Sequence, residues 1–277
     1  MLMSTQANRY AHQLLDARAE SRLIPPLSAQ EPLSATDAYD IAQCILETRI
    51  AQGEVQVGRK IGFTNRKIWT HYGVDQPIHM PIWTPMFDTT VRYIEDNHGL
   101  QGLKGAMQPR LGPELVFSLS RAPSRDATLE EIADCIEWMA HAFEIVTCPF
   151  PDWKFEEADA IAAFGMHGAL LIGEPKSLSA ASRRSLPEVL ANASLSVSCG
   201  EELRSAGFGS DVWGSPVHAL WQLNQILATQ EQFAPLAAGE IITTGTWADV
   251  LPVQAGQTWA TAFSGVSLPG LTISFVE

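Results

Sequence analysis

The sequence predicts an α+β protein, with helices concentrated towards the N-terminus and β-strands towards the C-terminus. Two observations support this class. Apolar residues recur at helical spacing before residue 53, whereas residues 241–276 contain short apolar runs separated by Gly and Pro turns. The chain contains no internal repeat. We expect a helical lobe over residues 1–68 and a larger β-rich domain over residues 69–277, integrated into one unit.

Two helices are predicted in the N-terminal lobe. Residues 4–21 have a weak amphipathic pattern, and a proline-bearing connection follows them. Ser34 is a suitable N-cap for the second helix, with Asp37 three positions further on and an apolar stripe beyond it. Gly53 is the expected end of that helix.

A third helix is predicted in the middle of the chain. Thr128 and Glu131 form a capping-box pattern, and the apolar residues after them predict a helix that continues to about Ala140. A strand over residues 143–147 should follow it. Further helices are predicted over residues 155–163 and from Ser215-Pro216 onward.

The remaining strands are predicted from short apolar runs bounded by Gly or Pro. They cover residues 55–63, 110–117, 169–172, 195–199, 241–244, 259–263 and 271–276. The segment 69–110 combines many Gly and Pro residues with large apolar side chains. An irregular segment of this hydrophobicity is expected to be a packed lid or a subunit contact rather than a disordered loop.

The composition restricts the possible functions. Hydrophobic residues make up 46% of the 277 positions and charged residues 18%, as in ordinary globular proteins. The net charge of −13 and the lack of a basic run argue against nucleic acid and anionic membranes as partners. The four cysteines form no CxxC pair and are expected to be reduced packing residues. No apolar run has the length of a signal peptide core or a membrane span, so we expect a cytoplasmic protein.

Two acidic residues occupy positions that should be buried. Glu114 and Glu144 each lie among apolar residues in a predicted strand. Burial of a carboxylate is costly unless a cation or hydrogen bonds compensate it, so the two residues form either structural salt bridges or a metal site. Oxygen ligands would suit Mg²⁺ or Mn²⁺ better than zinc. A third carboxylate could have stood two residues before Glu114, but that position is Gly112.

Lys60 precedes a glycine turn and follows apolar residues. It could be a surface lysine whose aliphatic stem packs on the protein. Alternatively, it could lie at the edge of a pocket, where it would bind a carboxylate or transfer a proton.

Other polar residues near these strands have weaker patterns. His141 and His167 are the nearest histidines, and each is expected to be a hydrogen-bonded core or pocket residue rather than a ligand. Lys154 could pair with Glu144 or with a substrate carboxylate. The segment Thr243–Trp247 offers hydroxyl groups and backbone N–H groups beside a glycine, which is a possible cradle for an anion. The chain contains no GxSxG, Walker or GxGxxG motif.

Taken together, the chain resembles the 2-keto-4-pentenoate hydratase and 2-oxohex-3-enedioate decarboxylase branch of the fumarylacetoacetate hydrolase superfamily. The resemblance spans nearly the whole chain and rests on several motifs in order. These are Gly58-Arg-Lys-Ile-Gly-Phe-Thr64, Tyr72-Gly-Val-Asp75, Pro113-Glu-Leu-Val-Phe117, Phe143-Glu-Ile-Val146, Asp152-Trp-Lys154, Gly214-Ser-Pro216 and Ile242-Thr-Thr-Gly-Thr246.

The resemblance implies a mixed, rolled β-sandwich with an N-terminal helical lobe, usually assembled into homo-oligomers. It also implies Mg²⁺ or Mn²⁺ held by three carboxylates. Glu114 and Glu144 match two of these ligands, whereas the first ligand falls on Gly112, so metal binding should be weak. Lys60 matches the active-site lysine. The substrate-binding positions suggested by the match are Thr64, His167, Gly245 and Thr246.

Two further family positions differ in this chain. An Asp-Asn pair of some members falls on Ala163 and Phe164, and an Asp-Tyr-Gly run falls on residues 78–80. The resemblance therefore implies an altered pocket.

The activity implied by the resemblance is the metal-assisted hydration of a small 2-hydroxy-2,4-dienoate, a late step of aromatic compound catabolism. One alternative is a decarboxylase of the 2-oxohex-3-enedioate type from the same family. Another is a catalytically weakened homologue that binds a 2-oxo acid or serves as a partner subunit. A C–C hydrolase is less favoured, because the sequence indicates no water-activating His–Glu pair.

Overall fold

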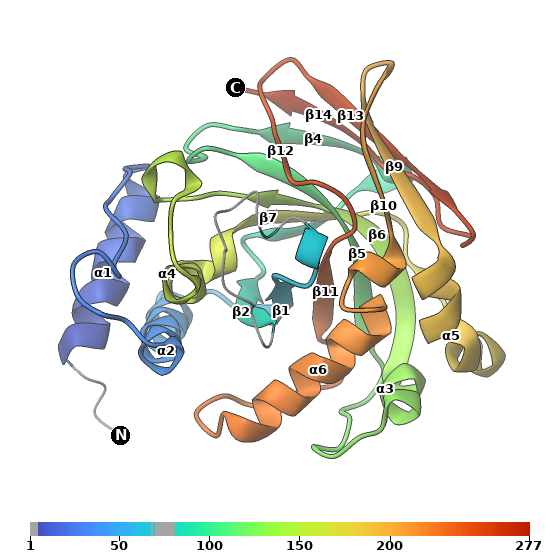
Figure 1. Ribbon diagram of the computed structural model, residues 1–277, viewed down its shortest axis with the longest axis horizontal. Helices are drawn as coiled ribbons and strands as arrows, with labels where there is room; N and C mark the ends of the chain where they lie inside the picture. The colour runs from blue at the N-terminus through green and yellow to red at the C-terminus, as the bar shows by residue number, and fades with distance from the viewer. Residues whose placement is uncertain (1–4, 68, 70–80) are drawn as a thin grey trace.

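The computed structural model describes residues 5–67, 69 and 81–277. The motif at residues 72–75 and the altered positions 78–80 lie outside the described residues. Figure 1 shows two β-sheets surrounded by helices, with helices α1, α2 and α4 on one side and α3, α5 and α6 on the other. The helices are α1 (Thr5–Ala19), α2 (Ala35–Ala51), α3 (Leu129–Cys135), α4 (Glu157–Ala162), α5 (Ala180–Asn192) and α6 (Pro216–Thr229).

The larger sheet has nine strands, seven of which follow the order β2-β1-β11-β5-β6-β7-β3, while β12 pairs with β5 and β8 with β6. Its strands are β1 (Gln56–Gly62), β2 (Ile82–Phe87), β3 (Val91–Tyr93), β5 (Arg110–Leu119), β6 (Ile136–Val146), β7 (His167–Ile172), β8 (Lys176–Ser177), β11 (Ile241–Thr246) and β12 (Leu251–Pro252). The sheet is mixed, because β1 runs parallel to β11 and β5 runs antiparallel to both β11 and β6.

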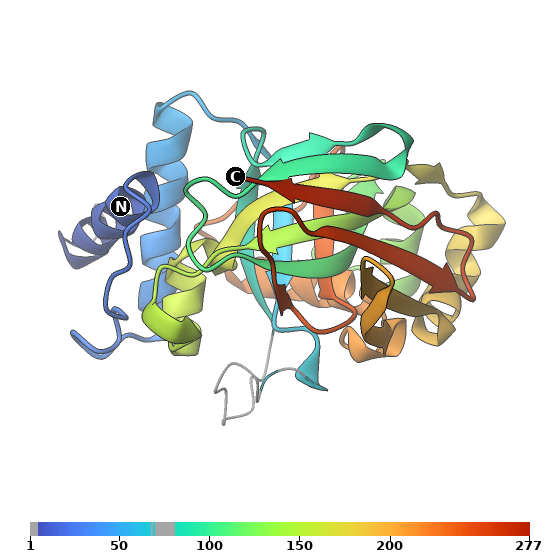
Figure 2. The same cartoon turned by 90° about the horizontal axis from the view of Figure 1, so that it is seen from above.

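The smaller sheet has five strands in the order β10-β9-β13-β14-β4. They are β4 (His98–Gly102), β9 (Ser194–Cys199), β10 (Glu202–Phe208), β13 (Thr258–Ser264) and β14 (Thr272–Val276). Figure 2 shows this sheet lying across the larger one. Buried residues of both sheets, including Phe117, Phe143 and Trp259, share one hydrophobic core. The predicted α+β roll is therefore confirmed.

The N-terminal helices pack against each other and against the edge of the larger sheet. The capping box of α2 is present, because the Ser34 hydroxyl accepts from the Asp37 N–H and the Asp37 carboxylate accepts from the Ser34 N–H. At the other end of α2, Arg49 pairs with Glu54 and lies 3.9 Å over the Phe87 ring. Strand β1 already belongs to the larger sheet. A division of the chain into two domains at residue 68 stays a prediction.

The predicted helix over residues 128–140 is wrong in its second half. The capping box of Thr128 and Glu131 is present, but α3 ends at Cys135 and β6 begins at Ile136. Strand β6 pairs with β5 from Ile136 to Val146, so its backbone N–H and C=O groups are satisfied by a long ladder. The tertiary pairing of the strand overrides the local helical periodicity.

The segment 69–110 is less irregular than predicted, because its described part contains β2, β3 and β4. Helix α5 and strands β8, β10 and β12 have no counterpart among the predicted elements. The other predicted helices and strands are present, with shifted ends. Among the described residues, no helix combines the length and apolar character needed to cross a membrane.

Candidate active site

A cavity lies where β1, β11, β5 and β6 run side by side, and residues from each of these strands line it. Lys60, Glu114 and Glu144 form its charged end. All three are almost completely buried, with 5%, 3% and 1% of their surfaces exposed. The interpretation of Lys60 as a surface lysine is therefore wrong. The strand order explains how residues far apart in the sequence reach the same cavity.

Glu144 binds two basic groups, one through each carboxylate oxygen. The Lys60 Nζ lies 2.8 Å from Oε2, and the His167 Nδ1 lies 2.8 Å from Oε1. Burial opposes ionisation, but the charge of Lys60 and the His167 contact hold the pKa of Glu144 below its ordinary value. Lys60, rather than Lys154, is therefore the lysine that pairs with Glu144.

Glu114 has a different environment from Glu144. Its Oε2 accepts a hydrogen bond of 3.1 Å from the Gly245 N–H. Burial and the nearby charge of Glu144 raise the pKa of Glu114 well above its ordinary value, although Lys60 opposes this rise. Two neighbouring buried carboxyl groups that share a single lysine favour one negative charge over two.

Gly112 leaves space beside these carboxyl groups. It faces Glu144 across the β5–β6 ladder and lines the same cavity. A Cβ atom at this position would lie 3.5 Å from Thr246 and 3.6 Å from Val250, which are ordinary contacts. No cluster of three or more His, Cys, Asp or Glu side chains suited to a metal ion occurs in the described part of the chain. The structure thus supplies two carboxylates and room for further ligands.

The irregular end of β11, where its register with β5 shifts between Thr243 and Thr246, is fixed by close packing. Gly245 has a φ of +99°, and a Cβ atom there would lie 1.8 Å from Thr64 Oγ1, so only glycine fits. The Thr64 hydroxyl donates to the Thr244 carbonyl at 3.0 Å. Thr64, Gly245 and Thr246 all line the cavity, as expected if they contact substrate. Their roles in binding stay predictions.

The anion cradle at Thr243–Trp247 stays a prediction, but three of its donors are engaged within the protein. The Gly245 N–H donates to Glu114, the Thr244 hydroxyl to Leu115 O and the Thr246 hydroxyl to Ala248 O. These donors are thus already used within the protein.

Asn65 also lines the cavity and donates to Thr246 O at 3.2 Å. No sequence pattern singled out Asn65, which directly follows the matched motif that ends at Thr64.

The two histidines have different positions. His141 joins the two sheets, with Nδ1 at 2.8 Å from Glu114 O and Nε2 at 2.8 Å from Thr261 Oγ1. Burial lowers its pKa to about 4, so it is neutral at pH 7.

His167 lies behind Glu144 and does not line the cavity. Its predicted contact with substrate is not tested by this arrangement. The His167–Glu144 pair itself escaped the sequence analysis, because the two residues meet only across β6 and β7.

Apolar side chains also line the cavity. Its wall is formed by Phe63, Trp153, Phe155, Met166, Ile82 and Val250. Three of these residues, Phe63, Trp153 and Met166, have positive φ angles of 57°, 58° and 61°. Such backbone conformations are costly for large side chains and cluster at functional sites. The cavity therefore combines a charged end with a shaped apolar wall.

The rolled pair of sheets thus brings a buried lysine and two carboxyl groups together in a cavity lined by four neighbouring strands. The model of the fumarylacetoacetate hydrolase C-terminal family matches residues 54–267. The chain belongs to this family, as its motifs predicted.

Relatives with assigned activities cover almost the whole chain. The 2-hydroxyhexa-2,4-dienoate hydratase of Comamonas testosteroni is 31% identical, over 99% of this chain and 98% of the relative. The 2-keto-4-pentenoate hydratase of Paraburkholderia xenovorans is 28% identical, over 94% of this chain and 92% of the relative. Among solved structures, 4-oxalocrotonate decarboxylase from Pseudomonas putida, in complex with magnesium and adipate, has a TM-score of 0.85. The decarboxylase is 21% identical in sequence, and the match covers 100% of this chain and 99% of the decarboxylase chain. This structure therefore supports the fold.

Proposed function

We propose that this protein is a hydratase that adds water to a small 2-hydroxy-2,4-dienoate and forms a 4-hydroxy-2-oxo acid. The observation that carries the proposal is a cavity whose lining combines a lysine and two carboxyl groups with an apolar wall. A 2-hydroxydienoate combines the same two features, a carboxylate with a C2 oxygen and a short hydrocarbon chain. The hydratase relatives support this substrate class.

The apolar wall favours hydration of a monocarboxylate over decarboxylation of a dicarboxylate. Lys60 is the only cationic residue among the described residues that line the cavity, and it is already paired with Glu144. A second substrate carboxylate would therefore find no further cation among the described residues that line the cavity. Moving an unpaired carboxylate from water into such a site costs on the order of several kcal/mol.

A divalent cation fits the charged end. Glu114 and Glu144 supply hard oxygen donors, and the space beside Gly112 leaves room for water and substrate oxygens. Mg²⁺ or Mn²⁺ bound there would polarise the C2 oxygen and stabilise negative charge on the enolate. Because Glu144 already binds Lys60 and His167, we expect weak affinity, in the millimolar range.

The residues of this chain would then orient the acid and move protons. Hydration requires two steps. In the first, C5 of the dienol gains a proton and the C2 hydroxyl group loses one. In the second, hydroxide adds to C4 and C3 gains a proton. The Lys60 ammonium lies at the buried end of the cavity and can carry a proton between substrate and Glu144. The apolar wall excludes bulk water from the conjugated chain. Thr64 and Asn65 would contact the substrate near its polar end.

The test is a direct assay of purified protein with Mg²⁺. Freshly prepared 2-hydroxypenta-2,4-dienoate should lose its dienol absorbance and yield 4-hydroxy-2-oxopentanoate. 2-Oxohex-3-enedioate, the dicarboxylate, should release little CO₂. Rapid CO₂ release without hydration would favour the decarboxylase. No reaction with several dienoates at saturating Mg²⁺ would contradict both activities and favour a non-catalytic binding role. Light scattering of the same sample would test the predicted homo-oligomer.

A further inference from the structure

Gln108 lies just before β5 and contacts the turn that carries Trp153. Trp153 belongs to the apolar wall of the cavity, and Gln108 itself does not line the cavity. The indole Nε1 of Trp153 donates to Gln108 O at 3.1 Å, and the guanidinium carbon of Arg110 lies 4.4 Å from the centre of the indole ring. Trp153 is only 7% exposed, so these contacts hold a buried side chain.

The side chain of Gln108 binds three backbone groups of the same turn. Its Nε2 donates to Cys148 O at 3.0 Å and to Phe150 O at 2.7 Å, and its Oε1 accepts from the Asp152 N–H at 2.9 Å. A main-chain N–H can only donate and a carbonyl oxygen can only accept, so these partners fix the orientation of the amide group. One side chain therefore ties together backbone groups from residue 148 to residue 152.

The turn depends on such contacts because its backbone is strained. Asp152 and Trp153 have φ angles of 56° and 58°, in a region that large side chains rarely adopt. Within the turn, the hydrogen bond from the Trp153 N–H to Phe150 O is long, at 3.4 Å. A strained backbone persists only where the surrounding structure holds it in place. Gln108 supplies this support from a distant part of the chain.

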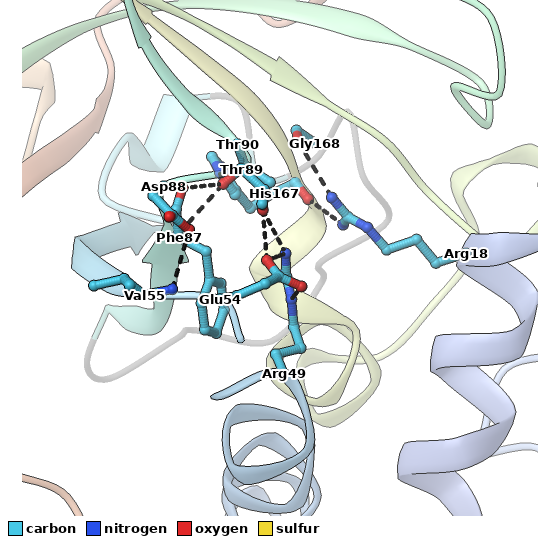
Figure 3. Close-up of polar contacts among 10 residues, drawn as sticks. All are labelled: Arg18, Arg49, Glu54, Val55, Phe87, Asp88, Thr89, Thr90, His167 and Gly168. Carbon is cyan, nitrogen blue, oxygen red and sulfur yellow. Dashed lines mark hydrogen bonds and ion pairs between the residues drawn. The ribbon is translucent and has the colours of Figure 1, made fainter. Parts of the chain in front are cut away.

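A second strained turn of the apolar wall is held separately. It contains Met166, whose φ is 61°. Figure 3 shows Arg18 beside the residues that follow this turn, where it donates to His167 O at 2.8 Å and to Gly168 O at 3.3 Å. The hydrogen bonds of Gln108 go to residues 148–153 instead. Loss of Gln108 should therefore release Trp153 and leave the turn at Met166 in place.

We propose that Gln108 is a positioning residue, whose amide group holds the turn at residues 148–153 so that the Trp153 ring is a fixed part of the apolar wall. Gln108 acts through Trp153 and does not touch substrate. A ring that is already fixed loses little conformational entropy when the hydrocarbon chain of the substrate packs on it, so Gln108 strengthens binding. The effect on binding rests on the proposed function, whereas the placement of Trp153 does not.

The first test needs no activity. In the wild type, the Trp153 indole N–H should exchange slowly with deuterium, because it is buried and donates to Gln108 O. The chain contains eight tryptophans, and the loss of one indole signal in Trp153→Phe identifies this group in nitrogen-15 NMR spectra. Gln108→Met keeps the length of the side chain without its hydrogen bonds, and exchange should accelerate by about tenfold or more. Fast exchange in the wild type, or unchanged exchange in Gln108→Met, would overturn the proposal.

The main-chain amides of residues 164–168 serve as an internal control in the same samples. They should exchange as in the wild type, because Arg18 holds that turn independently. Equal acceleration there would indicate a general loosening of the protein and contradict a specific role of Gln108.

The second test uses Gln257→Met as a matched control. The Gln257 side chain also accepts from a main-chain N–H, that of Gln254 at 2.9 Å, and from an indole N–H, that of Trp259 at 3.0 Å, but neither Gln257 nor Trp259 lines the cavity. Both methionine variants should lower stability. Only Gln108→Met should raise KM for 2-hydroxypenta-2,4-dienoate, by about tenfold with little change in kcat, because the wall binds substrate and transition state alike. An unchanged KM in Gln108→Met, or the same rise in Gln257→Met, would contradict the proposal.

A wild type that does not hydrate the dienoate would refute the proposed function, and the exchange test would still decide whether Gln108 holds Trp153. If Gln108→Met does not fold, Gln108→Glu takes its place. The carboxylate can accept from the Asp152 N–H but cannot donate to Cys148 O and Phe150 O, so faster indole exchange is again expected. Wild-type exchange in Gln108→Glu would then overturn the proposal.

Discussion

Gly112 lies directly opposite Glu144 in the antiparallel ladder of β5 and β6. Side chains of directly opposed residues point to the same face of a sheet, and residues two apart on one strand also share a face. An acidic side chain at position 112 would therefore stand beside both Glu114 and Glu144. The chain lacks this residue but retains the strand geometry around it, and this relationship makes the proposed metal site directly testable.

The variant Gly112→Glu should bind Mg²⁺ at least tenfold more tightly than the wild type, because a third carboxylate joins the same face of the sheet. The backbone accepts a side chain, since the atoms nearest to a Cβ at this position, in Thr246 and Val250, lie at ordinary contact distances. Titration calorimetry measures the affinity. Gly112→Gln, which has the same size without the charge, is the control. Equal affinities of the Glu and Gln variants would show that position 112 does not reach the cation.

Lys60→Met should abolish most hydratase activity and also destabilise the protein. Removal of one partner from a buried ion pair typically costs about 3–5 kcal/mol, because the remaining charge is left uncompensated. The Lys60–Glu144 pair is almost fully buried, so this range applies. The double variant Lys60→Met/Glu144→Gln should recover much of the stability but not the activity. Chemical denaturation of the wild type, Lys60→Met, Glu144→Gln and the double variant gives the coupling energy. Purely additive losses would exclude a strong interaction between the two side chains.

Acid should destabilise the protein partly through His141. The folded-state pKa of about 4 lies below the ordinary value of 6.5, so between these values the unfolded chain binds a proton that the folded chain does not. Stability should therefore fall as the pH decreases from 6.5 towards 4, by about 3 kcal/mol from this residue. His141→Gln should show a flatter dependence over this interval, measured by denaturation at several pH values. His12→Gln changes an exposed histidine and should keep the wild-type slope. An unchanged slope in His141→Gln would contradict the prediction.

Phe155→Ala should shift the substrate preference towards longer hydrocarbon chains. Phe155 lines the apolar wall, and its removal enlarges the space for the end of the dienoate. One methylene in an apolar pocket changes discrimination by roughly tenfold or more. The ratio of kcat/KM for the six-carbon and five-carbon dienoates should rise by about that factor. Phe208→Ala changes an exposed residue of β10 and serves as the control. A constant ratio would place the chain end elsewhere in the cavity.

Several features of the site could be predicted from local sequence. Glu114 and Glu144 were recognisable because carboxylates in apolar strands require compensation, and the motif around Lys60 placed it with them. Both capping boxes were correct, because each depends on residues only three positions apart. The helix predicted to extend to Ala140 failed, since local periodicity does not reveal that Ile136–Val146 pairs along the whole of β5.

The sequence by itself determined the fold family, the identity of the buried acids and the absence of a carboxylate at position 112. Only the tertiary structure decided the partners of these acids. Lys60 on β1 reaches Glu144 on β6 although β11 and β5 lie between their two strands, and His167 reaches it from the neighbouring β7. Such contacts join positions more than twenty residues apart, and their electrostatics depend on burial that no local pattern encodes.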